Sequence, residues 1–178
     1  HYEALAGKTD SYSDKAVEKA VENMEKMSDD EAKRNMKNLE KLESIKDEKT
    51  SKPKYSGEDR VEEAKNMTTE PKAAGAILSI AKRKDMDGHH LKGISSNLVQ
   101  NPDMIPSYSE LLDVKDCSGE YKFNKETLLG QTNYMVNLSS KEIESYAEKI
   151  IEYAQYDDIS GEDATSYAEQ VMETPSLE

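Results

Sequence analysis

Apolar residues recur at every third or fourth position through most of the chain, which is the spacing of amphipathic helices. The clearest stripe follows Ser139 and comprises Ile143, Ala147, Ile150, Ile151 and Ala154. Capping-box sequences start at Ser28, Ser107 and Ser139, and each predicts the first turn of a helix. Only residues 120–123 are candidates for extended structure, and they are too short to form a sheet alone. The pattern predicts an all-α fold, a helical bundle of about seven to nine helices.

Residues 71–84 form the only stretch that is apolar almost without interruption. Between Ala73 and Ala81 the run is broken only by Gly75 and Ser79, so a helix here would be apolar on nearly every side. The run is much shorter than the roughly 20 residues that cross a bilayer. With Thr69 as the N-cap, this segment is predicted to be the central helix of a soluble core.

The predicted organisation has four parts. Residues 1–12 lack periodicity and are expected to form an extended arm. Residues 13–46 predict a charged amphipathic helical pair that breaks at Ser28, although one continuous helix is the alternative. Residues 47–58 contain Pro53 and Gly57 and read as a linker, followed by a compact helical domain over 59–178.

A narrow apolar stripe along residues 13–46 is the first candidate binding surface. Its members are Val17, Val21, Met24, Met36, Leu39 and Leu42. Two apolar residues per turn is typical of a contact with a partner helix, and we predict that this stripe binds a neighbouring chain. Packing of the same stripe on its own domain is an equally good interpretation.

Charge and cysteine content limit the partners and the compartment. The formal charge of −13 would repel a phosphate backbone and an anionic membrane, so we expect no general nucleic-acid binding and no membrane attachment. The charge is uneven, because residues 139–178 hold eleven acids and two lysines. Cys117 is the single cysteine and cannot form an internal disulfide, which favours the reducing cytoplasm or a sealed particle over a disulfide-forming secretory route.

One cluster has residue types that bind metals, namely Asp85, Asp87, His89 and His90. Adjacent histidines on a helix point about 100° apart, and no spacing typical of a zinc site supports them. A polar loop with exposed histidines is the preferred interpretation. Since no phosphate-binding glycine loop or nucleophile motif is present either, we expect no enzyme activity, no catalytic residue and no cofactor.

The tripeptide Ser-Gly-Glu recurs at Ser56, Ser118 and Ser160, and the chain ends in Ser176, Leu177 and Glu178. A small residue, any residue and then Glu resembles the cut sites of the capsid-maturation proteases of giant tailed bacteriophages. This resemblance implies a processed internal or structural head protein, with Ser176, Leu177 and Glu178 as the processing site. A turn followed by a helix start also explains the internal copies.

These observations predict a non-enzymatic structural or interaction subunit of a larger assembly, such as a capsid-internal or accessory protein of a tailed phage. Its partners would be other virion subunits or further copies of itself. The first alternative is an acidic adaptor that binds a basic protein through the acids of residues 139–178. The second is a metal-dependent enzyme that uses the Asp-Gly-His-His loop.

Overall fold

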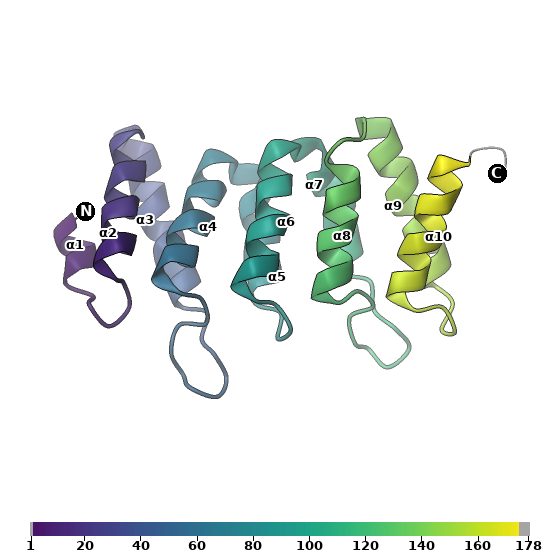
Figure 1. The fold of residues 1–178 in the computed structure, drawn as a ribbon, viewed down its shortest axis with the longest axis horizontal. Helices are drawn as coiled ribbons and strands as arrows, with labels where there is room; N and C mark the ends of the chain where they lie inside the picture. The colour runs from purple at the N-terminus through teal and green to yellow at the C-terminus, as the bar shows by residue number, and fades with distance from the viewer. Residues whose placement is uncertain (1, 175–178) are drawn as a thin grey trace. The chain divides into compact units, whose positions relative to one another are not determined.

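The structure, a computed structural model, describes residues 2–174 and is all-helical, as predicted. Within these residues there are ten α-helices, two 3-10 helices and no strand. The α-helices are labelled in Figure 1. In chain order the elements are α1 (Tyr2–Ala6), α2 (Asp14–Glu25), α3 (Asp29–Glu43), α4 (Gly57–Thr69), η1 (Pro71–Ala73), α5 (Ala74–Ala81), α6 (Gly88–Gln100), η2 (Pro102–Met104), α7 (Ile105–Leu112), α8 (Lys125–Met135), α9 (Ser140–Ala154) and α10 (Gly161–Glu173).

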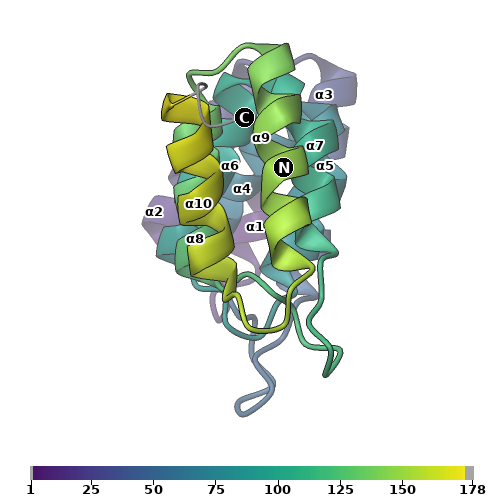
Figure 2. The same ribbon diagram turned by 90° about the vertical axis from the view of Figure 1, so that its right-hand side faces the viewer.

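The chain divides into two compact units, residues 1–99 and residues 100–178, here unit 1 and unit 2. Within unit 1, α2, α4 and α6 form one layer and α3 and α5 the other (Figures 1 and 2). Within unit 2, α8 and α10 form one layer and α7 and α9 the other. Helix α3 packs on α4, so residues 47–58 join two helices of one unit, and the predicted domain boundary at this loop differs from the observed division.

A local arrangement recurs where α2, α4, α6, α8 and α10 begin. In four of them a buried apolar side chain directly precedes the capping residue, as in Tyr12-Ser13, Tyr55-Ser56, Met86-Asp87 and Phe123-Asn124. The caps lie roughly 30 to 45 residues apart, a spacing typical of helical repeat proteins. Each unit is therefore a short stack of helical hairpins.

Close packing explains two of the three Ser-Gly-Glu sequences. Ser56 and Ser160 are N-caps, and the glycine that follows each is the first residue of a helix. A Cβ atom on Gly57 would lie 2.9 Å from the carbonyl oxygen of Ser11, and one on Gly161 would overlap the carbonyl of Lys122. The third copy lies in a loop, where Gly119 has a φ of 84°.

The N-terminal prediction is confirmed in one part and wrong in another. The break at Ser28 is present, since the hydroxyl of Ser28 accepts from the amide of Glu31 and the carboxylate of Glu31 accepts from the amide of Ser28. The extended arm over residues 1–12 is not observed, because Tyr2–Ala6 forms α1 and packs on α2 with Leu5 buried. Packing can stabilise a helix too short to form alone.

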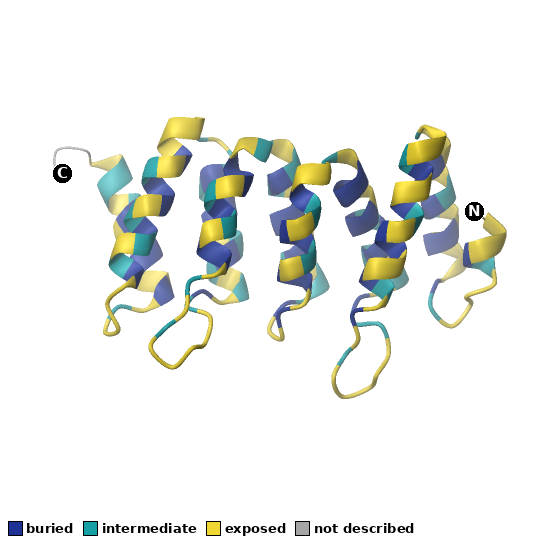
Figure 3. Cartoon of the chain, turned by 180° about the vertical axis from the view of Figure 1, so that it is seen from behind, coloured by how far each residue is buried: buried dark blue, intermediate teal, exposed yellow. Residues whose placement is uncertain are grey.

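The central helix of unit 1 is α4, not the apolar run at 71–84. That run is split into η1 and α5, and its Gly75 and Ser79 are exposed, so it is not enclosed on all sides (Figure 3). Thr69 ends α4, and the carboxylate of Glu70 accepts from the amide of Lys72 instead. Helix α4 contacts α2, α3 and α5, and it buries Val61, Ala64 and Met67.

Candidate functional site

The predicted partner-binding stripe lies inside unit 1. Val17, Met24, Leu39 and Leu42 are at most 6% exposed, and Val21 and Met36 are half-buried. They line the faces along which α2 and α3 contact each other and α4. The stripe is therefore core, which was the alternative interpretation, and it does not present a free surface to another chain.

Of the four candidate metal ligands, only Asp87 and His90 are shown in direct contact through their side-chain polar atoms. The carboxylate of Asp87 accepts from the amide of His90 at 2.8 Å and lies 2.8 and 2.9 Å from its Nδ1, so this pair caps α6. His89 is exposed, and Asp85 lies 3.8 Å from Nε of Arg83. Within residues 2–174, no three His, Cys, Asp or Glu side chains are placed to hold a metal ion. Ser176, Leu177 and Glu178 lie outside the described residues.

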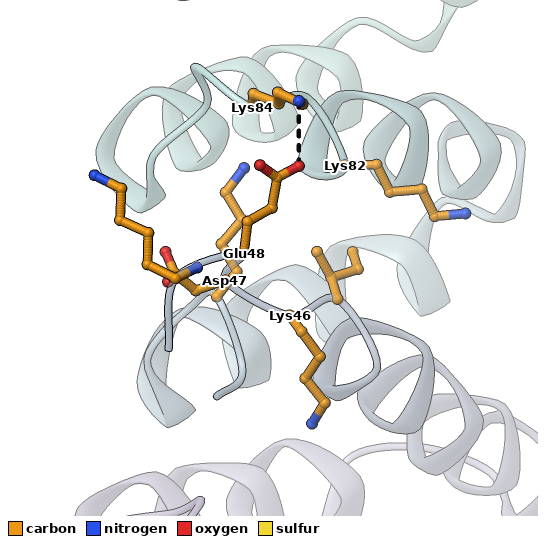
Figure 4. A pocket seen from close by; sticks show the side chains of 8 residues that line it. Lys46, Asp47, Glu48, Lys82 and Lys84 are labelled. Carbon is orange, nitrogen blue, oxygen red and sulfur yellow. Dashed lines mark hydrogen bonds and ion pairs between the residues drawn. The ribbon is translucent and has the colours of Figure 1, made fainter. Parts of the chain in front are cut away.

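A pocket lined mainly by lysines lies in unit 1, where the loop between α3 and α4 meets the end of α5. Its volume is about 290 Å³. We call it the lysine pocket, and its lining consists of Ile45, Lys46, Asp47, Glu48, Lys49, Lys54, Lys82 and Lys84 (Figure 4). Five cations against two acids is a local excess of positive charge in a chain of net charge −13.

Asp47 shapes the loop that forms one wall of the lysine pocket. Its Oδ1 accepts from the amides of Lys49 and Thr50, at 3.0 and 2.9 Å, and from the hydroxyl of Thr50 at 3.1 Å. These bonds, those from Thr50 above all, hold the pKa of the Asp47 carboxyl below its usual value. This carboxylate is one of the two acids that face the five lysines of the pocket, so an excess of positive charge remains.

Lys54 and Tyr55 fasten the loop to the carboxyl end of α5. The Nζ of Lys54 donates to the carbonyls of Ala81, at 3.4 Å, and Arg83, and the hydroxyl of Tyr55 donates to Ala81 at 2.6 Å. These donors satisfy carbonyls that a helix end leaves free. Partial burial lowers the pKa of Lys54, and the neighbouring Asp85 opposes that shift. The loop that lines the pocket is therefore held in place against the end of α5.

The other lysines are available to a ligand. Lys84 lies 3.4 Å from Glu48, but both side chains are more than 70% exposed, and such surface pairs contribute little free energy. Figure 4 shows Lys46 and Lys82 extending away from this pair. Within the described part of the chain, Lys46, Lys49 and Lys82 form no ion pair. The pocket can thus pair with the carboxylates of an acidic ligand.

Unit 2 carries most of the net negative charge of the chain. It holds 17 of the 37 acids but only 5 of the 24 basic residues, giving −12 against −1 for unit 1. Its acidic groove, about 400 Å³ between α8 and α10, is lined by Glu126, Glu162 and Glu169 among small polar residues. Glu169 also accepts from the buried hydroxyl of Tyr146 at 3.0 Å. The acids that the sequence singled out in residues 139–178 thus contribute to a defined groove.

The lysine pocket was missed in the sequence because its walls are far apart there. Lys46 lies at the end of the predicted helical pair, and Lys49 and Lys54 lie in the predicted linker. Lys82 and Lys84 belong to the apolar segment over residues 71–84. One sequence signal could have pointed to the pocket, namely the apolar residue that directly precedes the N-cap of α2, α4, α6 and α8. Its recurrence indicates that the segments before these helices are comparable loops. Comparable loops precede α4 and α8, each with an isolated bridge, Lys46 with Pro53 and Lys115 with Tyr121.

Comparison of the chain with protein-family models, with curated proteins and with solved structures found no match. Among the helices of residues 2–174, none combines the length and the apolar character needed to span a membrane.

Proposed function

We propose that this chain is a non-enzymatic interaction subunit of a larger assembly, and that its lysine pocket binds an acidic segment of a protein partner. The observation that carries the proposal is the convergence of five lysines on one pocket of an acidic chain. Stacked helical hairpins commonly serve as binding scaffolds, and their loops can differ without disturbing the stack.

The construction of the pocket suits this role. Lys54 and Tyr55 hold the loop against α5, and the bonds of Asp47 fix its turn. A preformed site loses less conformational entropy on binding than a flexible one. The exposed lysines would attract a carboxylate-rich segment over a distance of about 10 Å at moderate salt. We therefore expect fast, salt-sensitive binding.

The test is binding of a fluorescently labelled polyglutamate peptide to the full chain, followed by anisotropy. Replacing Lys82 and Lys84 with Glu should weaken binding at least about tenfold, or 1.4 kcal/mol. The matched control replaces the exposed Lys33 and Lys37 of α3 with Glu, which changes the net charge equally but lies outside the pocket. Equal weakening by both double variants would show that the peptide responds to net charge and not to the pocket.

The narrower proposal, a processed virion protein of a tailed phage, rests on the resemblance of the Ser-x-Glu tripeptides to capsid-maturation cut sites. An intact mass of the protein from its native source that matches residues 1–178 would support it. A mass that extends past either end would contradict it.

A second candidate function, an acidic adaptor for a basic protein, is favoured by the acidic groove and the −12 charge of unit 2. We expect a polylysine peptide to bind, and replacing Glu126 and Glu162 with Gln to weaken that binding. The exposed Glu144 and Glu148 of α9 give the matched control pair. Binding that persists in 1 M NaCl would argue against both charge-led proposals, because screening is nearly complete there.

A further inference from the structure

A second pocket in unit 1 shares no lining residue with the lysine pocket. It has a volume of about 760 Å³ and lies between the loop that precedes α2 and the loop that precedes α4. Its lining comprises Thr9, Asp10, Ser11, Tyr12, Ser13, Ser51, Lys52, Pro53, Tyr55, Ser56, Gly57 and Arg60. This size is within the range of pockets that hold small molecules, and it exceeds what an isolated phosphate ion needs.

Arg60 is the buried cation of this pocket, and its charge has no partner of opposite sign. The side chain is 1% exposed, and its guanidinium stacks 4.3 Å from the centroid of the Tyr12 ring. It donates to two backbone carbonyls, those of Ser11 and Ser56, while Nη1 has no hydrogen-bond partner. Within residues 2–174, no carboxylate forms an ion pair with it. Burying a cation without a counter-charge is costly, which indicates that an anion completes the site.

The rest of the lining favours an anion with several acceptor oxygens. Two helices begin at this pocket, α2 after Ser13 and α4 after Ser56, and helix N-termini attract anions. Hydroxyl-bearing residues form more than half of the lining, and the exposed Lys52 adds a second cation. The one acid in the lining is the exposed Asp10. Phosphate groups typically bind where arginine, hydroxyls and helix N-termini meet.

We propose that this pocket binds the phosphate group of a phosphomonoester, with Arg60 as its charge partner. The proposal is independent of the lysine pocket, whose ligand is a polypeptide rich in carboxylates. The volume left beside the phosphate would hold the organic part of the ligand.

The experiment is a titration of the full, nitrogen-15-labelled chain with O-phosphoserine and, separately, with inorganic phosphate, each against sodium chloride at matched ionic strength. We expect saturable shifts of the backbone amides in residues 9–13 and 51–57 with O-phosphoserine. Similar saturation with inorganic phosphate would show that the free ion is enough, whereas weaker saturation would show that the organic part contributes. No saturable shift with either probe would overturn the proposal.

Two variants test whether the cations of the pocket contribute to binding. Arg60→Gln removes the buried charge and should abolish saturation. Because Arg60 also holds two backbone carbonyls, Lys52→Glu provides a second test at an exposed position, and it should weaken O-phosphoserine binding about tenfold. Lys84→Glu, which reverses a charge in the lysine pocket, is the matched control and should leave the affinity within about twofold. Equal weakening by Lys52→Glu and Lys84→Glu would overturn the assignment.

Discussion

The hydroxyl of Ser95 donates a hydrogen bond of 3.0 Å to Oε1 of Glu63 and so joins α6 to α4. Glu63 is 1% exposed, and its Oε2 has no hydrogen-bond partner. Asn66 extends the connection by donating to the Ser95 hydroxyl at 3.1 Å. Burial raises the pKa of the Glu63 carboxyl to about 8, although the hydrogen bond from Ser95 acts to lower this pKa. At neutral pH this carboxyl is therefore largely protonated.

This buried carboxyl makes the stability of the chain depend on pH. Between about pH 4.5 and pH 8 the folded protein keeps a proton that the unfolded chain releases, so the contribution of Glu63 to stability falls as the pH rises. The glutamine of Glu63→Gln cannot ionise, so the variant lacks this pH dependence. We expect the free energy of unfolding of the variant, relative to the parent protein, to be about 1–3 kcal/mol higher at pH 8 than at pH 5. Urea unfolding at the two pH values measures this difference.

The adjacent Glu62 provides the control for that measurement. It pairs with Lys19 at 2.7 Å, and a hydrogen bond from Lys19 lowers its pKa. Its contribution is therefore present above about pH 4.5 and is lost as the pH falls. Glu62→Gln should therefore lower the stability slightly at pH 8, whereas Glu63→Gln should raise it. An equal effect of Glu63→Gln at both pH values would contradict the assignment of the raised pKa.

Two glycines should respond to alanine in opposite directions. Gly161→Ala brings a Cβ atom against the carbonyl of Lys122 and the ring of Phe123, and we expect a loss of about 1–3 kcal/mol. Gly130→Ala adds a methyl group within α8 where no atom lies within 4 Å, so a gain of about 0.5–1 kcal/mol is expected. Thermal unfolding of both variants is the measurement, and a loss from both would contradict this account of the close contact.

Thr68 connects α4 to α3 through two asparagines. Asn38 donates to its hydroxyl at 3.0 Å, and the hydroxyl lies 3.2 Å from Oδ1 of Asn35. Thr68→Val leaves buried amide groups without a partner and should cost about 1–3 kcal/mol. Thr69→Val, at the exposed next position, should stay within about 0.5 kcal/mol of the parent protein in chemical denaturation.

Substitution of Leu39 and Leu42 tests whether the apolar stripe of residues 13–46 is core or a binding surface. Because both are at most 1% exposed, replacing them with Asp should unfold unit 1, at a cost above about 4 kcal/mol. Hydrogen exchange resolved by peptide would show loss of protection in α2, α3 and α4. Retention of that protection together with loss of self-association or partner binding would restore the stripe as an interface.

Local signals in the sequence predicted local structure. The capping boxes at Ser28 and Ser139 are both formed, because each depends only on residues within one turn. The box at Ser107 is not used, since Pro106 lies in the first turn of α7 and the helix already begins at Ile105. Helices were thus easier to detect than their exact starts.

Burial of polar groups and the assembly of loops could not be predicted in the same way. Arg60 and Glu63 are ionisable residues of the kind that normally indicates a solvated face, yet the packing of α4 against α2, α3, α5 and η1 encloses them. The lysine pocket and the pocket around Arg60 each combine segments separated by about 30 to 50 positions, and neither has a short sequence signature. Only packing of the helices reveals which of these residues meet.

Tyr55 and Phe123 anchor the bases of two comparable loops, whereas the tips, residues 47–52 and 116–120, lie largely in solvent. Since the anchor and the cap set how each following helix docks, the tip between them can be exchanged without rebuilding the scaffold. Grafting one tip onto the other anchor would then transfer ligand preference alone, so that specificity in this molecule can evolve separately from its foldability.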